Sequence, residues 1–282
     1  MKKAIKKIIN KIAIKKVPIY VPVYEGEILK GKTILVTGGT SGIGYSIAEA
    51  SLKNGANVII TERNKEKLDN ALKTLKKSTK DAKIYGIDFD ISNIEMIESK
   101  VSEIVNMIGN LKIDILVNNA GVNTKEKFLN TTIDDFNNVI NTNLEGTYFL
   151  SQTIANYMIK NKIEGNILFI ASSSSIRPVF NTYSLSKWGI KGLVVGMAKK
   201  LVKYGITVNG IAPGPTATPM LNMSNKTDDI NHNNNPIGRY VLPEEIANMA
   251  VFMMSDMGKS IIGDIVYMTG GAGTITYDDI EY

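Results

Sequence analysis

The amino-acid sequence predicts an α/β protein built on one doubly wound parallel sheet of about seven strands, with helices on both faces. Short apolar and β-branched segments alternate with segments of helical periodicity from about residue 29 to residue 275. A glycine-rich turn joins the first of these strands to the helix that follows it. Polar or glycine residues stand directly after several strands, where sheets of this architecture bind ligands.

Composition limits the chemistry that the chain can carry out. At 282 residues it is long enough for one large domain, and 44% hydrophobic and 21% charged residues are ordinary for a soluble globular protein. The absence of cysteine excludes disulfides and thiolate sites. His232 is the only histidine, so neither a serine–histidine–aspartate triad nor a metal site is predicted.

Residues 1–28 are predicted to form a basic arm and connector ahead of one domain over residues 29–282. Residues 1–16 contain seven lysines and no acidic residue, whereas the rest of the chain carries 26 basic and 27 acidic residues. The nearly neutral body argues against a nucleic-acid partner. The arm has the pattern of a basic amphipathic helix. We favour a solvated arm or a contact with a neighbouring subunit, with a peripheral membrane contact as the alternative.

The glycine-rich turn is predicted to bind the pyrophosphate of a dinucleotide, as in a Rossmann-like fold. Residues 32–36 form a strand, a helix is expected over about residues 45–54, and residues 57–61 complete a βαβ unit. Glycines let the backbone approach a phosphate at the helix N-terminus. The spacing is TGxxxGxG, and the candidate binding residues are Gly38, Thr40, Ser41, Gly42, Ile43 and Gly44.

Glu62 ends the second strand about 20 residues after the glycines, where an acidic residue hydrogen-bonds the ribose hydroxyls of NAD. Arg63 follows directly, and an arginine in this region can instead accept the 2′-phosphate of NADP. Because Glu62 precedes Arg63 at the end of this strand and its carboxylate would repel the 2′-phosphate, NAD(H) is favoured over NADP(H).

Two further strands end in candidate ligand-binding residues. Asp90 follows the strand over residues 83–89 and is placed to meet an adenine amino group. The strand over residues 113–117 runs into Asn118-Asn119-Ala120-Gly121, where amides and small residues suit a backbone lying against a ligand. A turn would use such an asparagine equally well.

The second half of the chain adds an interrupted helix and a long loop. Asn143 lies within a predicted continuous helix over residues 139–153, so it either bends this helix or has a function. A later strand ends in the proline- and threonine-rich residues 213–218. Residues 220–235 have the length and composition of a lid loop, and His232 within it is expected to be exposed to solvent rather than catalytic.

Tyr183 and Lys187 form the candidate centre for proton transfer. A buried strand over residues 167–171 leads into four serines, Ser172 to Ser175, and then into a helix that carries both residues. Four residues make about one helical turn, so the phenol and the ammonium leave the same face. A neighbouring cation favours phenolate, which predicts a lowered tyrosine pKa and proton exchange with an alcohol or carbonyl. The alternative is a helix whose tyrosine and lysine face solvent, and the YxxxK spacing taken alone favours that alternative.

Together these motifs closely resemble those of the short-chain dehydrogenase/reductase family of NAD(P)-dependent oxidoreductases. TGGTSGIG at residues 37–44 resembles its cofactor loop, NNAG at 118–121 its second signature, and YSLSK at 183–187 its catalytic motif. NTNLEG at 141–146 resembles the stretch with its active-site asparagine, and PGPTAT at 213–218 its nicotinamide-side loop.

The resemblance implies a role for each matching residue. Tyr183 would be the general acid/base, and Lys187 would lower its pKa and hold the nicotinamide ribose. Ser172 would orient the substrate oxygen, and Asn143 would hold a water in a proton relay. The residues implied along the cofactor are Asp90, Ile91, Asn118, Ala120, Gly121, Pro213, Gly214, Thr216 and Thr218, together with Tyr183 and Lys187.

The loop between the catalytic serine and tyrosine is about two residues shorter here than is usual in the family. Ser173 or Ser174 therefore remains an alternative to Ser172, and the substrate pocket is expected to be reshaped. Lys125, Lys127 and Arg177 suggest a polar or anionic substrate, although solvated loop charges are the preferred reading.

The predicted function is an NAD(P)-dependent interconversion of a secondary alcohol and a ketone. The alternative is a catalytically silent nucleotide-binding scaffold or sensor on the same fold. A small-molecule substrate, a homotetramer or dimer built partly on the helix of Tyr183, and a cytoplasmic location are expected with the family resemblance.

Overall fold

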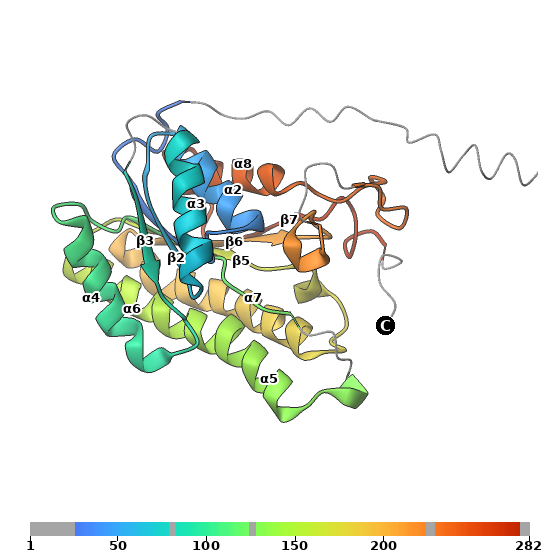
Figure 1. Cartoon of the computed structure of the whole chain (residues 1–282). Coiled ribbons are helices and arrows are strands. Elements are labelled where there is room, and N and C mark those ends of the chain that lie inside the picture. Colours follow the sequence, from blue (N-terminus) through green and yellow to red (C-terminus); the bar gives the residue numbers. More distant parts are fainter. Residues whose placement is uncertain (1–25, 79–82, 124–127, 224–228, 277–282) are drawn as a thin grey trace, which may run out of the picture.

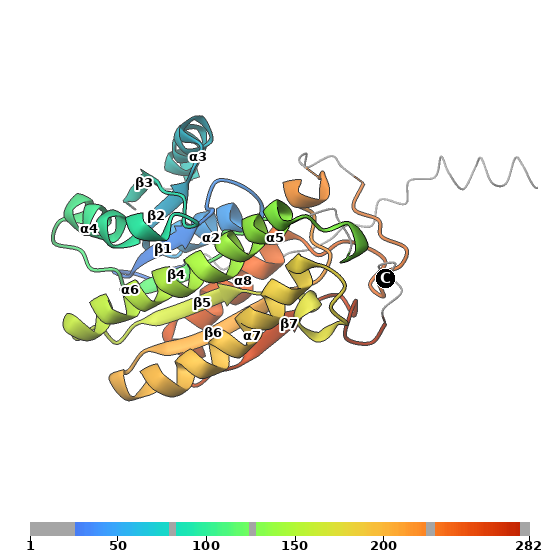
Figure 2. The ribbon, with the colours of Figure 1, turned by 90° about the horizontal axis from the view of Figure 1, so that it is seen from below.

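Seven parallel strands form one sheet in the order β3-β2-β1-β4-β5-β6-β7 (Figures 1 and 2). The computed structural model describes residues 26–78, 83–123, 128–223 and 229–276. The strands are β1 (Thr33–Thr37), β2 (Asn57–Glu62), β3 (Ile84–Asp88), β4 (Ile115–Asn118), β5 (Asn166–Ile170), β6 (Thr207–Pro213) and β7 (Ile265–Met268). The predicted doubly wound parallel sheet is confirmed.

Helices α2, α3 and α8 cover one face of this sheet, and α4, α6 and α7 cover the other (Figures 1 and 2). The longer helices are α2 (Gly42–Lys53), α3 (Lys65–Ser78), α4 (Ile97–Ile108), α5 (Ile133–Ile140), α6 (Thr147–Lys160), α7 (Thr182–Leu201) and α8 (Pro243–Met254). Single turns are η1 (Ile94–Met96), η2 (Phe128–Asn130), η4 (Ser173–Ile176), η5 (Val202–Tyr204), η6 (Pro219–Leu221) and η7 (Asp256–Gly258).

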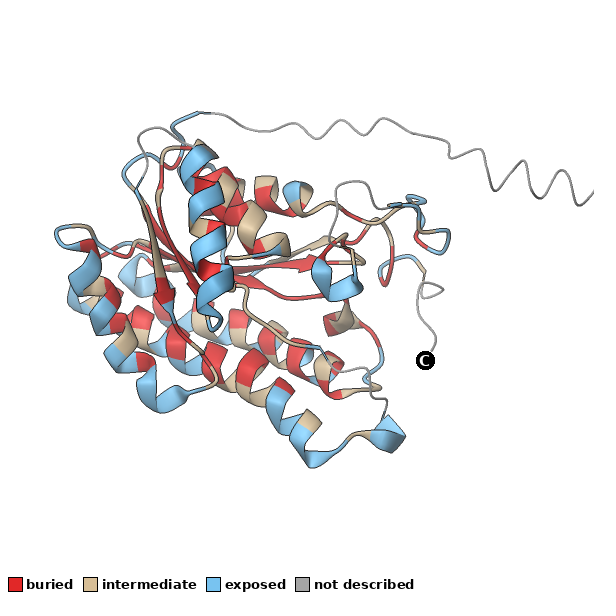
Figure 3. Cartoon of the chain, viewed as in Figure 1, coloured by how far each residue is buried: buried red, intermediate tan, exposed pale blue. Residues whose placement is uncertain are grey.

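Side chains that alternate along the strands build two cores, one on each face of the sheet. In β1, Ile34 and Val36 pack toward α2, α3 and α8, whereas Leu35 packs toward α4, α6 and α7. All three side chains are fully buried, and burying each contributes about 1.5–3 kcal/mol. The same separation is visible as buried strands between helices with exposed outer faces (Figure 3). These two cores fix the strand ends on which the functional residues stand.

The helix predicted over residues 139–153 is not one regular α-helix. Between α5 and α6, the six residues of η3 (Asn141–Gly146) form a π-helical turn. A π-turn shifts the side chains that follow it out of α-helical register and is common at functional sites. The prediction that Asn143 bends the helix or has a function is consistent with this turn.

The sheet order changes direction between β1 and β4, so the loops after these strands diverge and leave a crevice at the carboxyl edge. Among the described residues, no helix is both long and apolar enough to span a membrane, and no group of three or more acidic or histidine residues is arranged for a metal ion. The arm predicted over residues 1–28 lies almost entirely outside the described residues, so the predicted domain division is left untested.

Candidate active site

A cavity of about 830 Å³ lies at the carboxyl ends of the strands. Its walls come from the loops after β1 to β6, the first turn of α7, and the segment that contains His232 and Tyr240. The predicted site residues that line it are Gly38, Ser41, Gly42, Ile43, Glu62, Arg63, Asp90, Ile91, Ala120, Gly121, Ser172, Tyr183, Lys187, Pro213, Gly214, Thr216 and Thr218. Four predicted residues do not line it, namely Thr40, Gly44, Asn118 and Asn143.

The glycine loop opens the N-terminus of α2 toward this cavity. Gly38 and Gly42 have φ angles of 62° and 53°, a region that disfavours a side chain. Ser41 precedes the helix and makes no side-chain capping bond, so it leaves the first N–H groups to a phosphate. A Cβ atom on Gly44 would collide with the Asn119 side chain. Gly44 therefore allows close packing behind the loop instead of forming the cavity wall.

The carboxylate of Glu62 lies at the end of β2 and is held by three hydrogen bonds. Thr40 Oγ1 donates to Glu62 Oε2 at 2.6 Å. The N–H groups of Arg63 and Asn64 donate to Oε1 at 3.0 and 3.2 Å. The side chains of Arg63 and Lys67 are exposed and line the same part of the cavity. An acidic acceptor and two cations thus stand together at this end.

Asp90 stands in the loop after β3. Its Oδ1 atom accepts hydrogen bonds from the Ser92 N–H at 3.0 Å and the Ser92 hydroxyl at 2.7 Å. These bonds close a turn that presents Phe89, Asp90 and Ile91 to the cavity. Asp90 and Ile91 therefore lie on the cavity wall.

Asn118 points away from the cavity, although the family resemblance implies a position along the cofactor. Its side-chain amide donates to Ser151 Oγ at 2.9 Å inside the protein. The next residue, Asn119, lines the cavity instead and donates to the Thr37 and Gly38 carbonyls at 2.9 and 3.0 Å. Successive side chains at a strand end point to opposite sides, so the two asparagines separate. Asn119 ties β4 to the glycine loop.

Ser172, Tyr183 and Lys187 meet at the middle of the cavity, where β5 ends and α7 begins. The Ser172 side chain is hydrogen-bonded to Tyr183. Lys187 is only 6% exposed, and its Nζ atom donates to the Ile170 carbonyl at 2.9 Å. The Asn181 side chain caps α7 by accepting from the Ser184 N–H at 2.8 Å, which fixes where the helix starts and hence where Tyr183 points.

The predicted lowering of the Tyr183 pKa is wrong for this structure. Burial raises the pKa of Tyr183 above its ordinary value, and the hydrogen bond from Ser172 offsets only part of this rise. Lys187 Nζ lies over the Tyr183 ring, 5.5 Å from its centroid. Burial also lowers the pKa of Lys187 to about 8. The same low-polarity surroundings that hold both groups oppose both of their charged forms.

Asn143 does not reach the cavity, because its side chain is used by the backbone beside it. Its Oδ1 accepts from the Val122 N–H at 2.8 Å, and its Nδ2 donates to the Val122 carbonyl at 2.9 Å. Nδ2 also contacts Ser186 Oγ at 3.2 Å, and that hydroxyl donates to the Tyr183 carbonyl at 2.7 Å. Asn143 therefore connects the loop after β4 to the helix of Tyr183.

The structure distinguishes the three candidate serines by their hydrogen bonds. Ser172 is the serine bonded to Tyr183, and its Oγ also accepts from the Ser174 N–H at 3.1 Å. Ser173 and Ser174 line the cavity but have no described bond to Tyr183. The Trp188 indole donates to the Arg177 carbonyl at 2.8 Å and holds the end of this short loop.

The cavity wall also carries aromatic residues. His232 is half-buried and stacks edge to face on Tyr240, with ring centroids 4.6 Å apart. Both rings line the cavity, so the expectation that His232 is simply exposed to solvent is wrong. Phe180, from the loop before α7, and the buried Arg177 also line the cavity. This wall can accept an apolar or aromatic substrate group.

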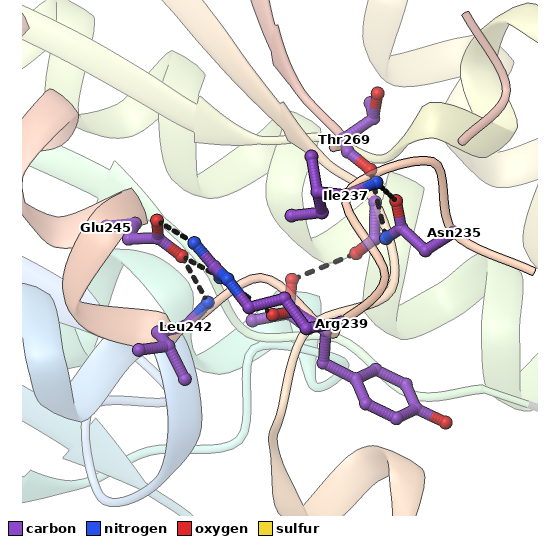
Figure 4. A network of polar contacts seen from close by, with 9 residues as sticks. Asn235, Ile237, Arg239, Leu242, Glu245 and Thr269 are labelled. Carbon is purple, nitrogen blue, oxygen red and sulfur yellow. Dashed lines mark hydrogen bonds and ion pairs between the residues drawn. The ribbon is translucent and has the colours of Figure 1, made fainter. Parts of the chain in front are cut away.

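An ion pair fixes the base of the segment with His232 and Tyr240. Arg239 donates from both terminal nitrogens to the Glu245 carboxylate, each at 2.8 Å, and the Leu242 N–H donates to Glu245 Oε2 at 2.8 Å. Figure 4 shows the two side chains facing each other between this segment and the start of α8. The pairing lowers the pKa of Glu245 and raises that of Arg239. The segment is thus anchored to the sheet-facing helix.

Sequence reasoning missed several residues of the cavity wall. The sequence does contain a signal for Asn119 and Lys67. Asn119 follows Asn118 at a strand end, so its side chain points to the opposite side, and Lys67 lies in the first turn of the helix that follows Glu62. Tyr240 carried none, since it lies in an irregular segment that only the folded chain brings to the cavity.

Comparison with known protein families gives a match to most of the chain. A family model described as enoyl-(acyl carrier protein) reductase matches residues 38–273. The 3-oxoacyl-[acyl-carrier-protein] reductase FabG of Aquifex aeolicus (strain VF5) is 34% identical over 248 residues, which cover 86% of this chain and 98% of that protein.

Two solved structures with bound nucleotides are similar to this one. A short chain dehydrogenase from Burkholderia cenocepacia J2315 in complex with NADP has a TM-score of 0.76 and 29% identity, covering 86% of this chain and 98% of that chain. A 3-ketoacyl-(acyl-carrier-protein) reductase from Brucella melitensis complexed with NADH has a TM-score of 0.77 and 27% identity, with the same coverage of 86% and 98%.

Proposed function

Because the chain belongs to the short-chain dehydrogenase/reductase family of NAD(P)-dependent oxidoreductases, we propose that Tyr183 is the general acid/base with which it interconverts a secondary alcohol and a ketone. The observation that carries this proposal is the hydrogen bond between Ser172 and Tyr183, beside the buried Lys187, in the cavity that also receives the open N-terminus of α2. The catalytically silent alternative is not retained, since the relatives are named for reductase and dehydrogenase activities.

The residues of the cavity fit a nicotinamide dinucleotide. The open N-terminus of α2 and the positive φ angles of Gly38 and Gly42 make a phosphate cradle. Glu62 would accept from the adenosine ribose, and Asp90 and Ile91 would meet the adenine. The loop with Thr216 and Thr218 also lines the cavity. When bound, the nicotinamide supplies or accepts the hydride.

The chain's own residues manage the proton. In ketone reduction the Tyr183 phenol donates its proton to the carbonyl oxygen, and in alcohol oxidation its phenolate takes the hydroxyl proton. Ser172 donates a hydrogen bond to the same oxygen, where negative charge develops. Lys187 would hold the ribose next to the nicotinamide. We assign Asn143 a positioning role, because its amide is occupied by Val122 and Ser186.

We propose NAD(H) as the preferred cofactor. Glu62 presents a fixed carboxylate to the cavity, and a carboxylate hydrogen-bonds ribose hydroxyls but repels a 2′-phosphate. Arg63 and Lys67 oppose this preference from the same wall. The similar structures contain NADP in one case and NADH in the other, and titration of this chain with both nucleotides tests the preference.

A homotetramer or dimer is proposed on the face formed by α5, α6 and α7. Large hydrophobic side chains on these helices are exposed, among them Phe136 at 41%, Tyr148 at 45% and Val195 at 55%. A cavity of about 420 Å³ next to them is lined by apolar residues that include Phe136 and Leu185. An exposed apolar surface of this kind favours association. Residues 1–16 are proposed as a solvated arm or a second subunit contact. A cytoplasmic location stays a prediction.

The decisive experiment separates nucleotide binding from turnover. NADH and NADPH are titrated into the protein by fluorescence, and reduction is then assayed with 3-oxoacyl thioesters first, because the FabG relative is named for such a substrate. Replacing Tyr183 by Phe should abolish turnover and keep the NADH affinity, whereas the exposed Tyr204→Phe control should keep both. If neither nucleotide binds at micromolar concentrations, the proposed function is rejected.

The membrane alternative for residues 1–16 has its own test. Full-length protein and a variant without these residues are compared by flotation with anionic liposomes. Equal binding of both proteins rejects a membrane contact through this arm.

A further inference from the structure

We propose that Thr40 is a positioning residue that sets the preference for NADH over NADPH by holding the Glu62 carboxylate in place. The inference rests on the proposed function, because it concerns the nucleotide that this cavity binds. The sequence places Thr40 among residues that touch the nucleotide. The structure instead places its side chain behind the carboxylate, and it is the only member of the glycine loop whose hydroxyl is bonded to Glu62 in the described structure.

The geometry of the carboxylate is the first argument. Thr40 Oγ1 lies 2.6 Å from Glu62 Oε2, a short distance typical of a hydroxyl that donates to an ionised oxygen. The other oxygen, Oε1, is already bonded to the N–H groups of Arg63 and Asn64. Oε2 is thus the oxygen with room for a further donor. Its orientation depends on Thr40, because no other described donor is bonded to it.

The place of the two residues in the fold is the second argument. Glu62 lines the cavity, whereas Thr40 does not. Their hydrogen bond joins the turn after β1 to the end of β2, across 22 residues of sequence. The backbone repeats this connection, since the Gly39 N–H donates to the Thr61 carbonyl at 3.3 Å. The glycine loop, which is proposed to bind the pyrophosphate, therefore also fixes the Glu62 carboxylate that is proposed to bind the ribose.

The charges around Glu62 explain why its orientation matters for selectivity. Arg63 and Lys67 line the same wall, and either cation would attract a 2′-phosphate. The fixed carboxylate opposes them, because it accepts from a ribose hydroxyl and repels a phosphate. Without the Thr40 hydroxyl, the carboxylate can rotate away from the ribose. NADH then loses a well-placed acceptor, while NADPH encounters less repulsion.

The two effects act in opposite directions on the two nucleotides. Losing one charge-assisted hydrogen bond changes an affinity by about tenfold. We therefore expect Thr40→Val, which keeps the shape of the side chain but lacks the hydroxyl, to lower the ratio of the NADPH dissociation constant to the NADH constant by about fivefold to tenfold. Thr40→Ser keeps the hydroxyl and should keep the wild-type ratio.

The test measures dissociation constants for NADH and NADPH with the full chain by fluorescence titration. Wild type, Thr40→Val, Thr40→Ser and Thr40→Ala are compared, and Thr40→Ala provides a second hydroxyl-free variant should Thr40→Val fold poorly. The same Thr40→Val change is also made together with Glu62→Gln. The ratio should then stay at the value of Glu62→Gln alone, because Thr40 acts through the carboxylate.

Three results would overturn the inference. A ratio in Thr40→Val and Thr40→Ala equal to the wild-type ratio would do so, even if both affinities fall, because a merely structural role weakens both nucleotides alike. A wild-type preference for NADPH would do so directly. A Thr40→Val effect of the same size in the Glu62→Gln background would show that Thr40 acts by another route. Failure of the proposed function is distinct, since wild type would then bind neither nucleotide.

Discussion

Replacing Lys187 by methionine should abolish turnover and at the same time make the protein more stable. Lys187 is 6% exposed, and its Nζ atom lies over the Tyr183 ring. Its ammonium donates one hydrogen bond, to the Ile170 carbonyl, while burial lowers its pKa from 10.5 to about 8. A methionine fills a similar unbranched space without a charge. The stability cost of the charge should therefore disappear in the variant.

The magnitude follows from the pKa of Lys187. Each pKa unit corresponds to about 1.4 kcal/mol, so a fall from 10.5 to about 8 makes the charged lysine cost about 3 kcal/mol in the folded protein at pH 7. Methionine cannot donate the hydrogen bond to the Ile170 carbonyl, and losing this bond reduces the stability gain by about 1 kcal/mol. The net gain of Lys187→Met is then about 2 kcal/mol, or about 4–8 °C in Tm.

The pH dependence gives a sharper test than the absolute value. Because the folded-state pKa of Lys187 lies below its unfolded value, the unfolded chain binds more protons between pH 8 and pH 10.5. The stability of the wild type therefore rises with pH in this window. The cost is fully present below pH 8, and about 2 kcal/mol of the advantage of Lys187→Met should vanish between pH 7 and pH 9.5.

The assay is urea unfolding of wild type and variant at equal protein concentration across this pH range, with reversibility checked at each pH. Lys199→Met is the matched control, because Lys199 lies on the same helix but is exposed, and its unfolding free energy should stay within about 0.5 kcal/mol of wild type. If Lys187→Met is no more stable than wild type at pH 7, or if its advantage does not shrink with pH, the argument from desolvation is refuted.

Three further predictions test other parts of the site and the surface. In wild type the hydrogen bond with Ser172 lowers the Tyr183 pKa, so Ser172→Ala should raise this pKa and move the rising limb of the pH–rate profile for alcohol oxidation to higher pH. The same variant should reduce kcat by about 10²–10³, and an equal effect of Ser174→Ala would contradict this. Gly146→Ala should lower the unfolding free energy by about 1–3 kcal/mol, because a Cβ there would collide with the loop after β3; unchanged urea unfolding would refute it. Val195→Glu should reduce the mass measured by light scattering with circular dichroism unchanged, and an unchanged mass would place the subunit contact elsewhere.

The architecture was predictable because its signals are local and repeat along the chain. The glycine turn after β1, the acidic residue that ends β2 and the polar residues after later strands all lie at the carboxyl ends of apolar strands. Parallel strands bring their carboxyl ends to one edge, so sequence order alone places these residues together.

The remaining features depend on distances that sequence spacing does not contain. The YxxxK spacing places Tyr183 and Lys187 on one helix face, but it does not tell that both are enclosed, and enclosure reverses the predicted pKa of Tyr183. The exposure of His232 likewise depends on Tyr240, with which it stacks. In both cases the sequence identifies the residues, whereas tertiary contacts determine the pKa of Tyr183 and the solvent exposure of His232.

The π-turn η3 shows how one local irregularity organises the cavity. Its wider turn brings the Asn143 side chain to the Val122 backbone, in the loop after β4. Through Ser186, Asn143 also contacts the helix of Tyr183. Gly146 at the end of the turn packs against the Ile91 carbonyl so closely that a Cβ does not fit. The turn therefore connects the adenine-side loop, the loop after β4 and the catalytic helix, and a change within it should affect nucleotide binding and proton transfer together.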